Sequence, residues 1–279
     1  MEIAYGRGVM QGVGNYVAAQ MRSESGFAWR LYRSRPDPGI LPLMKQWKPD
    51  GVSAHIATRE LADRLARWKT PVINTTTTIP DWKGALIEVD HHMVGRMAAK
   101  HFLDRGFRSF GYVGSDWAGF SLVRESAFRQ VIGQAGYLVD SLHLNYLPLP
   151  PTDQAWDSID GQVIAWLQRL EKPTAIFASN DRPAREVADA CASIALRVPD
   201  AVAILGVDDD EYECFLGDPP LSSICNPSEK IGRLAAETLE AMMLGKDDEP
   251  IRRMIPTRQI AVRRSSDSYA VDDPYLKSA

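Results

Sequence analysis

The chain has 279 residues, which is enough for one large α/β domain or for two lobes of ordinary size, and we expect two lobes. Its 32 basic and 36 acidic residues are scattered along the sequence and give a formal charge of -4, which excludes a basic stripe that would grip nucleic acid. Three cysteines without C-x-x-C spacing exclude a disulfide framework and a zinc site. No apolar run reaches membrane-spanning length and the amino terminus is no signal peptide, so we expect a cytoplasmic protein without a membrane partner.

The first half of the chain alternates helix and strand patterns. Small and apolar residues at helical spacing predict a helix from Tyr5 to about residue 21, and so few residues precede it that we expect a shortened first strand. Strand patterns then occur at 28–32, 51–54, 71–74 and 86–89, and helical patterns at 40–47, 59–68 and 91–105. Gly106 follows the last of these helices, where a C-cap favours positive φ. This alternation is typical of a parallel sheet.

The second half of the chain continues in the same way. Strands are predicted at 110–113, near Leu142, at 175–178, in the run that ends before Asp208 and at 258–262, and helices at 121–135, 156–170, 184–195 and 231–244. A Pro-rich loop at 147–151 precedes Thr152 and Asp153, which are good helix caps. From residue 265 the sequence turns polar and predicts a linker that leads out of the domain.

Two of the predicted strands end in acidic polar clusters, Asn180-Asp181 and Asp208-Asp209-Asp210. Polar groups at the carboxyl end of a parallel strand face the crevice where open α/β sheets bind ligands. We therefore expect the two clusters to converge on one small polar molecule. Three consecutive acids do not fit a calcium loop, so Asp208 is expected to face the ligand and its two neighbours to serve the loop or a helix cap.

Four further residues are candidates for the same site. Arg124 lies near the start of a helix after an aromatic-rich loop, and a surface position is an equally good interpretation. Asp90 follows a predicted strand and is equally well explained as a helix N-cap. A guanidinium and carboxylates hydrogen-bond vicinal hydroxyls well, and aromatic faces such as those of Tyr5 and Trp117 cover the C–H surface of a sugar.

Other chemistry finds little support. The spacing Gly8, Gly12, Gly14 matches the nucleotide-binding turn of short-chain dehydrogenases, but no full strand precedes it and no Tyr is followed four residues later by Lys. We interpret these glycines as allowing a helix to approach a sheet closely. His91-His92 and His101 lack further ligands at supporting intervals and are expected on a solvated helix face. The sequence therefore predicts no enzyme, no cofactor and no bound metal.

Several strings resemble one family, the sensor domain of the lactose and galactose repressors, which has the type I periplasmic binding protein fold. The chain is more similar still to the xylose-operon regulators, in which such a sensor precedes an AraC-type DNA-binding domain. The tail VRRSSD at 262–267 is the most diagnostic string. The others are AYGRG at 4–8, Val89-Asp90 with Gly95 and FLDRGF at 102–107, Arg124 before ESAFRQ, SND at 179–181, GVDD at 206–209 and PPLSSI at 219–224.

The resemblance implies an α/β, two-lobed fold in which each lobe is a parallel sheet sandwiched by helices. It places 1–107 and 226–245 in the amino-terminal lobe, 108–225 and 246–264 in the carboxy-terminal lobe, and 265–279 in a linker toward a DNA-binding domain that this chain lacks. By position, Arg124 matches the family's sugar-clamping Arg and Asp208 its later-strand Asp. Asn180-Asp181 matches the polar pair, and Asp90 the first-lobe acid.

The resemblance also implies a function, the sensing of a small polyol between the lobes, with a pentose such as xylose as the expected ligand. Lobe closure would act on a DNA-binding domain outside this chain, in a homodimer. One alternative is a periplasmic sugar-binding transport protein, which would need a secretion signal. A second is a short-chain-dehydrogenase-like enzyme, which would bind a nicotinamide cofactor.

Overall fold

The computed structural model describes residues 4–22, 28–34, 38–144, 153–246 and 251–270, without the side chains of 38 and 153–159. The chain divides into two compact units. The first comprises Met1–Asp90, Ala118–Phe120 and Pro227–Pro256, and the second His91–Trp117, Ser121–Asn226 and Thr257–Ala279. Among the described residues, none of the helices has the length and apolar content needed to cross a membrane.

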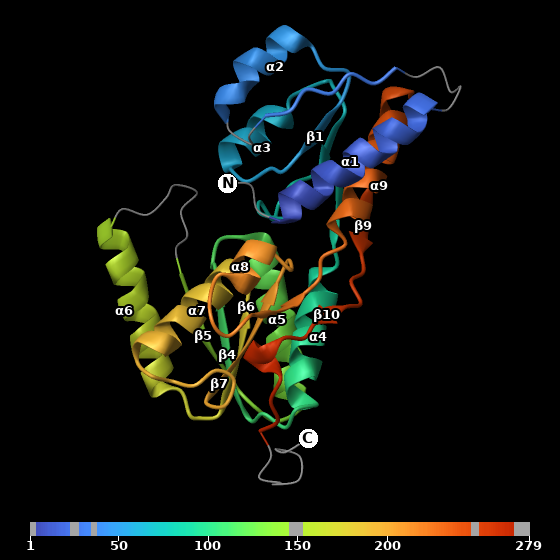
Figure 1. The fold of residues 1–279 in the computed structure, drawn as a ribbon. Coiled ribbons are helices and arrows are strands. Elements are labelled where there is room, and N and C mark those ends of the chain that lie inside the picture. Colours follow the sequence, from blue (N-terminus) through green and yellow to red (C-terminus); the bar gives the residue numbers. More distant parts are fainter. Residues whose placement is uncertain (1–3, 23–27, 35–37, 145–152, 247–250, 271–279) are drawn as a thin grey trace. The chain divides into compact units, whose positions relative to one another are not determined.

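The first unit is built on a four-stranded sheet whose strands are all parallel and follow the order β1-β2-β3-β9. These strands are β1 (Val52–Ala54), β2 (Val72–Asn74), β3 (Ala85–Val89) and β9 (Arg252–Ile255). Figure 1 shows α1 and α9 side by side on one face of this sheet and α2 and α3 on the other. The helical segments are α1 (Ala4–Arg22), η1 (Pro38–Ile40), α2 (Leu41–Trp47), α3 (Arg59–Leu65) and α9 (Ser228–Met243).

Glycines bring α1 and α9 into direct backbone contact. A Cβ added at Gly12 would lie 1.9 Å from the carbonyl oxygen of Glu229, and one added at Gly232 would lie 1.9 Å from that of Val9. A Cβ at Gly8 would lie 2.0 Å from the hydroxyl of Ser228, whereas one at Gly14 meets nothing within 4 Å. The glycines thus allow close packing of α1, as the sequence predicted. The element that α1 approaches is the helix α9, however, and not a sheet.

The second unit contains a six-stranded sheet of order β10-β8-β7-β6-β4-β5, which is parallel except for the antiparallel pair of β10 and β8. Its strands are β4 (Ser109–Gly114), β5 (Val139–His143), β6 (Thr174–Ala178), β7 (Val202–Val207), β8 (Ser222–Ile224) and β10 (Ile260–Ala261). The helices α4 and α5 cover one face and α6 and α7 the other (Figure 1). The helical segments are α4 (His91–Leu103), α5 (Gly119–Gln134), α6 (Asp153–Arg169), α7 (Asp181–Ser193), α8 (Glu211–Phe215) and η2 (Arg264–Ser266).

The central strands of the second unit explain its core. Every residue of β6 and β7 is buried, because helices cover both faces of the sheet. Ile176 contributes to the cluster that α6 and α7 cover, while the ring of its neighbour Phe177 packs against Phe128 of α5 at a centroid distance of 5.2 Å. The expected α/β fold with parallel sheets flanked by helices is therefore confirmed.

The compact units divide the chain at different residues from the lobe boundaries placed from the sequence. Residues 91–107 fall in the second unit, where the ring of Phe102 packs edge-on against Phe107 and Phe128. The segment 246–256 falls in the first unit, because β9 pairs with β3.

The start of the expected linker also differs from the structure. Ser265 and Ser266 are fully buried, and Ser265 Oγ donates to the carbonyl oxygen of Ile204 at 2.7 Å. A linker starting at residue 265 is therefore wrong, because these two residues pack on the sheet. The expectations for residues 1–3, 147–152 and 271–279 lie outside the described residues.

Candidate ligand-binding site

The two acidic clusters lie at the same edge of the second sheet. β6 and β7 are neighbours and parallel, with Phe177 opposite Leu205, so their carboxyl ends point the same way. Asp181 begins α7 shortly after β6, and Asp208 follows β7 directly. The structure thus brings together the two clusters that the sequence singled out.

Asp181 is almost completely buried, with 1% of its surface exposed, and its carboxylate is engaged inside the unit. Oδ2 accepts a hydrogen bond from the backbone N of Asp210 at 2.7 Å, and Oδ1 accepts one from Ser223 Oγ at 2.6 Å. Burial, with the nearby Asp208 charge, raises the pKa of Asp181 well above its ordinary value. Asp181 therefore fixes the loop after β7 and presents little of its own surface.

Asp208 and Asp209 both have left-handed backbone conformations, with φ of 109° and 53°. Non-glycine residues in such conformations cost about 1–3 kcal/mol each and persist only where the surroundings hold them. Asp208 N donates to the carbonyl oxygen of Ile224 at 3.0 Å, and Asp209 N donates to Ser223 Oγ at 2.9 Å. Burial raises the pKa of Asp208 to about 6, against the opposing effect of the Arg124 charge. Asp210 caps α8 by accepting from Tyr212 N at 3.1 Å, as expected of a capping residue.

Arg124 is a buried side chain, with 3% of its surface exposed, so a surface position is wrong. Its Nε donates to Nδ1 of His91 at 3.2 Å, and its Nη1 donates to the carbonyl oxygen of Ser179 just after β6. A buried guanidinium needs such partners to offset the loss of its hydration. α4 approaches closely here, since a Cβ added at Gly95 would lie 2.4 Å from the Arg124 carbonyl oxygen. Arg124 is thus a fixed positive charge beside Asp208.

Asn180 and Trp117 present polar and aromatic surface in the same unit. Asn180 occupies the N-cap position of α7 in an extended conformation, but its side chain does not cap the helix. Instead its Oδ1 accepts from Ser179 Oγ at 3.4 Å. Trp117 follows β4 and has 40% of its surface exposed. Both side chains are therefore at least partly exposed in this unit.

The first unit places its candidates at the carboxyl edge of its own sheet. The hydroxyl of Tyr5 donates to the carbonyl oxygen of Thr75, one residue after β2, and the Tyr5 ring meets His55 edge-on at 6.2 Å. His55 follows β1, and burial lowers its pKa to about 4, so it is neutral at pH 7. Asp90 follows β3 and is half-buried, and its backbone N donates to the carbonyl oxygen of Ile255 at 2.9 Å. The ends of β1, β2 and β3 are thus followed by the polar residues His55, Thr75 and Asp90.

Sequence reasoning missed Asn226. Its Nδ2 donates to Asp208 Oδ1, while its own Oδ1 is buried and has no hydrogen-bond partner among the described residues. A buried acceptor without a donor is costly and is a common mark of a ligand position. Asn226 lies just beyond β8, which neighbours β7, so a search of every strand end, and not only the acidic ones, would have found it.

Two of the three histidines that were expected on a solvated helix face are buried. His91 and His101 are buried, and only His92 of the three is exposed. His101 Nε2 and Ser266 Oγ are hydrogen-bonded at 2.8 Å, and burial lowers the pKa of His101 to about 3. A solvated face is therefore wrong for both residues, because α4 packs inside the second unit. In the described part of the chain, no three His, Cys, Asp or Glu side chains are grouped to hold a metal ion.

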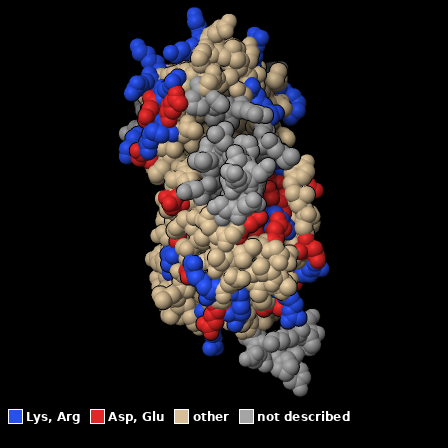
Figure 2. Space-filling model, turned by 90° about the vertical axis from the view of Figure 1, so that its left-hand side faces the viewer, with Lys and Arg blue, Asp and Glu red and all other residues tan. Residues whose placement is uncertain are grey.

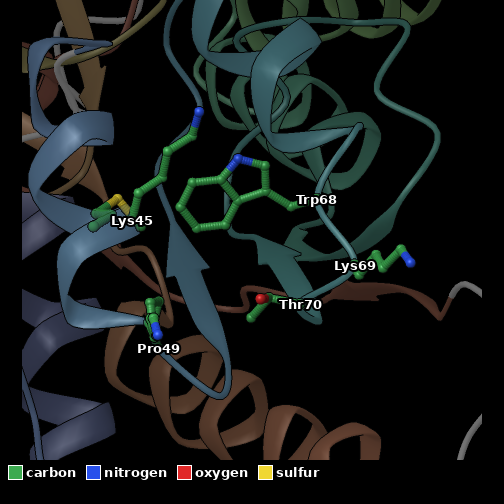
Figure 3. Close-up of a pocket in the computed structure, with 7 residues that line it drawn as sticks. Lys45, Pro49, Trp68, Lys69 and Thr70 are labelled. Carbon is green, nitrogen blue, oxygen red and sulfur yellow. The ribbon is translucent and has the colours of Figure 1, made fainter.

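A separate cavity of about 320 Å³ lies in the first unit, and lysines, and no acidic residues, are among the described residues that line it. Figure 3 shows the Lys45 side chain beside the Trp68 ring, while the Lys69 side chain points away from that ring. Lys45 lies in the last turn of α2, where a cation offsets the negative end of the helix dipole. Charges of both signs are interspersed over the described part of the face in Figure 2. The position of Lys45 is thus explained by helix stability.

The chain matches known proteins over nearly its whole length. A model of the periplasmic binding protein-like domain family matches residues 99–266. The xylose operon regulatory protein of Escherichia coli (strain K12) is 27% identical over 286 residues, which cover 99% of this chain and 70% of the relative. The relative's name is that of a transcription regulator and not of an enzyme.

Two solved structures share the fold. The first, of the xylose-binding transcription activator xylR, has a TM-score of 0.80 at 24% identity and covers 98% of this chain and 69% of that one. The second, the complex of the transcriptional regulator CelR with cellobiose, has a TM-score of 0.73 at 22% identity and covers 94% of this chain and 79% of that one. Since the family model spans more than half of the chain, this protein belongs to the periplasmic binding protein-like domain family.

Proposed function

We propose that this chain is the effector-binding domain of a transcription regulator that senses a small sugar, and that a pentose such as xylose is its ligand. The observation that carries the proposal is the buried Arg124 guanidinium beside Asp208, whose strained backbone is held at the carboxyl edge of the second sheet. A fixed cation and a fixed carboxylate match the paired donors and acceptors of vicinal hydroxyls. Relatives named as xylose operon regulatory proteins support the choice of sugar.

The side chains of the second unit have distinct roles in this proposal. Arg124 donates to sugar hydroxyls, Asp208 accepts from them, and Asn180 does both. Asn226 supplies the acceptor that has no partner in the described residues. Asp181 positions the loop from behind, because its oxygens already accept from Asp210 N and Ser223. Trp117 covers the C–H face of the ring.

In the first unit, Asp90 and Tyr5 contact the same sugar in this proposal. A sugar that binds side chains of both units stabilises the arrangement in which both reach it, and only this difference in binding free energy shifts the conformational equilibrium. The regulator then acts on DNA through an AraC-type domain outside these 279 residues, as a homodimer.

Calorimetric titration with a panel of sugars tests this function. D-Xylose, D-ribose, L-arabinose, D-glucose and cellobiose are compared on the wild-type chain and on Arg124→Ala and Asp208→Ala. Arg129→Ala is the matched control, since Arg129 lies on the same helix and is exposed. We expect D-xylose to bind the wild type and the control, and to lose at least tenfold in affinity for the other two variants. Equal D-xylose binding by all four proteins would overturn the site, and binding of no sugar would overturn the function.

A further inference from the structure

Arg263, which follows β10, forms an ion pair with Asp209, the residue after Asp208. Its Nη2 lies 2.6 Å from Asp209 Oδ1, and its Nη1 donates to the carbonyl oxygen of Leu221 at 2.8 Å. The guanidinium also stacks over the ring of Phe215, 4.8 Å from the centroid. Both charged side chains are less than one-third exposed, so solvent weakens the pair less than a surface pair. Arg263 is therefore held on several sides at once.

Hydrogen bonds also fix the backbone around Arg263 to the sheet. Ser222 Oγ accepts from Arg263 N at 2.8 Å and donates to the Arg263 carbonyl oxygen at 2.7 Å. Ser265 Oγ accepts from Ser222 N at 2.8 Å and donates to the carbonyl oxygen of Ile204 in β7. The segment from Arg263 to Ser266 thus has a defined position relative to β7 and β8, and a guanidinium on it is a rigid anchor.

Asp209 is the part of the site loop that needs such an anchor. It and Asp208 have consecutive left-handed conformations, so the loop depends on its partners to stay in place. The Asp209 side chain accepts from Arg263 through Oδ1 and from Cys225 Sγ through Oδ2 at 3.5 Å. The sulfur contact is the weaker of the two, because a thiol is a weak donor. Arg263 is thus the main restraint on the Asp209 side chain.

We infer that Arg263 is a positioning residue for the ligand site, because it holds Asp209 and thereby sets the direction of the Asp208 carboxylate. The ligand part of this inference rests on the proposed sugar function. The same ion pair joins the site loop to η2 and to the chain beyond it, which remains attached to the unit through the hydrogen bond from Ala270 N to the Arg105 carbonyl oxygen at 2.9 Å.

Hydrogen exchange and calorimetry on a small set of variants test the inference. Arg263→Gln removes the charge, Arg263→Lys keeps it, and Asp209→Asn removes the other partner while tolerating the left-handed conformation. Arg264→Gln is the control, since Arg264 pairs with the exposed side chain of Asp218. Exchange is measured at the amides of 206–211 in the ligand-free proteins, and D-xylose affinity is measured on the same samples.

The expected exchange at 206–211 is roughly tenfold faster in Arg263→Gln and Asp209→Asn, with Arg263→Lys close to the wild type and Arg264→Gln unchanged. D-Xylose affinity falls by a similar factor in the first two variants. Unchanged exchange at 206–211 in both of these variants overturns the inference, and so does faster exchange with unaltered D-xylose affinity. If the wild type binds no sugar but the exchange pattern holds, the sugar function falls while the positioning of the loop by Arg263 stands.

Discussion

The Nε of Arg124 donates to Nδ1 of His91 at 3.2 Å, and both side chains are buried. His91 must therefore carry its proton on Nε2, because Nδ1 acts as the acceptor. His91 thus orients the candidate ligand-binding Arg124 from the first turn of α4.

His91→Ala is expected to weaken D-xylose binding roughly tenfold, because Arg124 Nε loses its acceptor and the guanidinium its fixed orientation. His92→Ala is the matched control, since His92 is the exposed neighbour on the same helix. Calorimetric titration of both variants measures the effect. Equal loss of affinity in the two variants, or no loss in either, would show that His91 does not orient Arg124.

Asp208→Asn is expected to stabilise the ligand-free protein at pH 7 by on the order of 2 kcal/mol. Burial raises the pKa of Asp208 to about 6, so the folded chain holds this proton more tightly than the unfolded chain does. The stability that the protonated carboxyl provides is complete below about pH 4 and is lost as the pH rises through 6.

Urea unfolding of the wild type and of Asp208→Asn at pH 4 and pH 7 measures this effect. The difference between the two proteins reports on Asp208 together with the nearby Asp181, whose pKa is raised in part by the Asp208 charge. We expect a gain at pH 7 that nearly vanishes at pH 4, together with weaker D-xylose binding at both pH values. A gain that is the same at both pH values would contradict the raised pKa.

Gly12→Ala is expected to lower the free energy of unfolding by about 1–3 kcal/mol or more, because the new methyl group would lie 1.9 Å from the Glu229 carbonyl oxygen. Gly14→Ala on the same helix has open space and should be neutral or stabilising by up to about 1 kcal/mol. Urea unfolding of the two variants tests the packing of α1 on α9. Similar effects at both positions would be inconsistent with the close approach at Gly12.

The elements that were predictable from the sequence are those whose pattern depends on burial alone. β6 and β7 are apolar throughout because helices cover both faces, and that composition is visible in the chain. The strand expected at 28–32 is absent from the structure. There the Trp29 Nε1 donates to Glu240 at 3.1 Å and the Tyr32 ring stacks on Trp47 at 4.8 Å, so apolar residues pack by their side chains without joining a sheet.

The sequence did not predict β9, because most of this strand is exposed. It is an edge strand whose first three residues are exposed, including Arg252 and Arg253, so it lacks the apolar composition of the central strands. Its place in the first sheet is set by its pairing with β3, a contact between segments that are far apart in the sequence.

The positions of the site residues were predictable, but their partners were not. Strand ends place Asp181 and Asp208 at one edge of the sheet, and this follows from the sequence. The engagement of Asp181 depends on Ser223, which is 42 residues away, and the burial of His101 depends on Ser266, which is 165 residues away. Such long-range contacts decide which polar residues hold the loop and which are open to a ligand, and no local pattern contains them.

Arg124→Lys offers the most direct test of the central claim, that a fixed guanidinium beside Asp208 holds a sugar. Lysine keeps the positive charge but loses the planar fork of donors that reaches His91 and Ser179 together. The decisive measurement is the dissociation constant of D-xylose for the wild type and for Arg124→Lys, obtained by calorimetry at pH 7. We expect saturable binding to the wild type and at least tenfold weaker binding to the variant, whereas equal constants for the two proteins would contradict the claim.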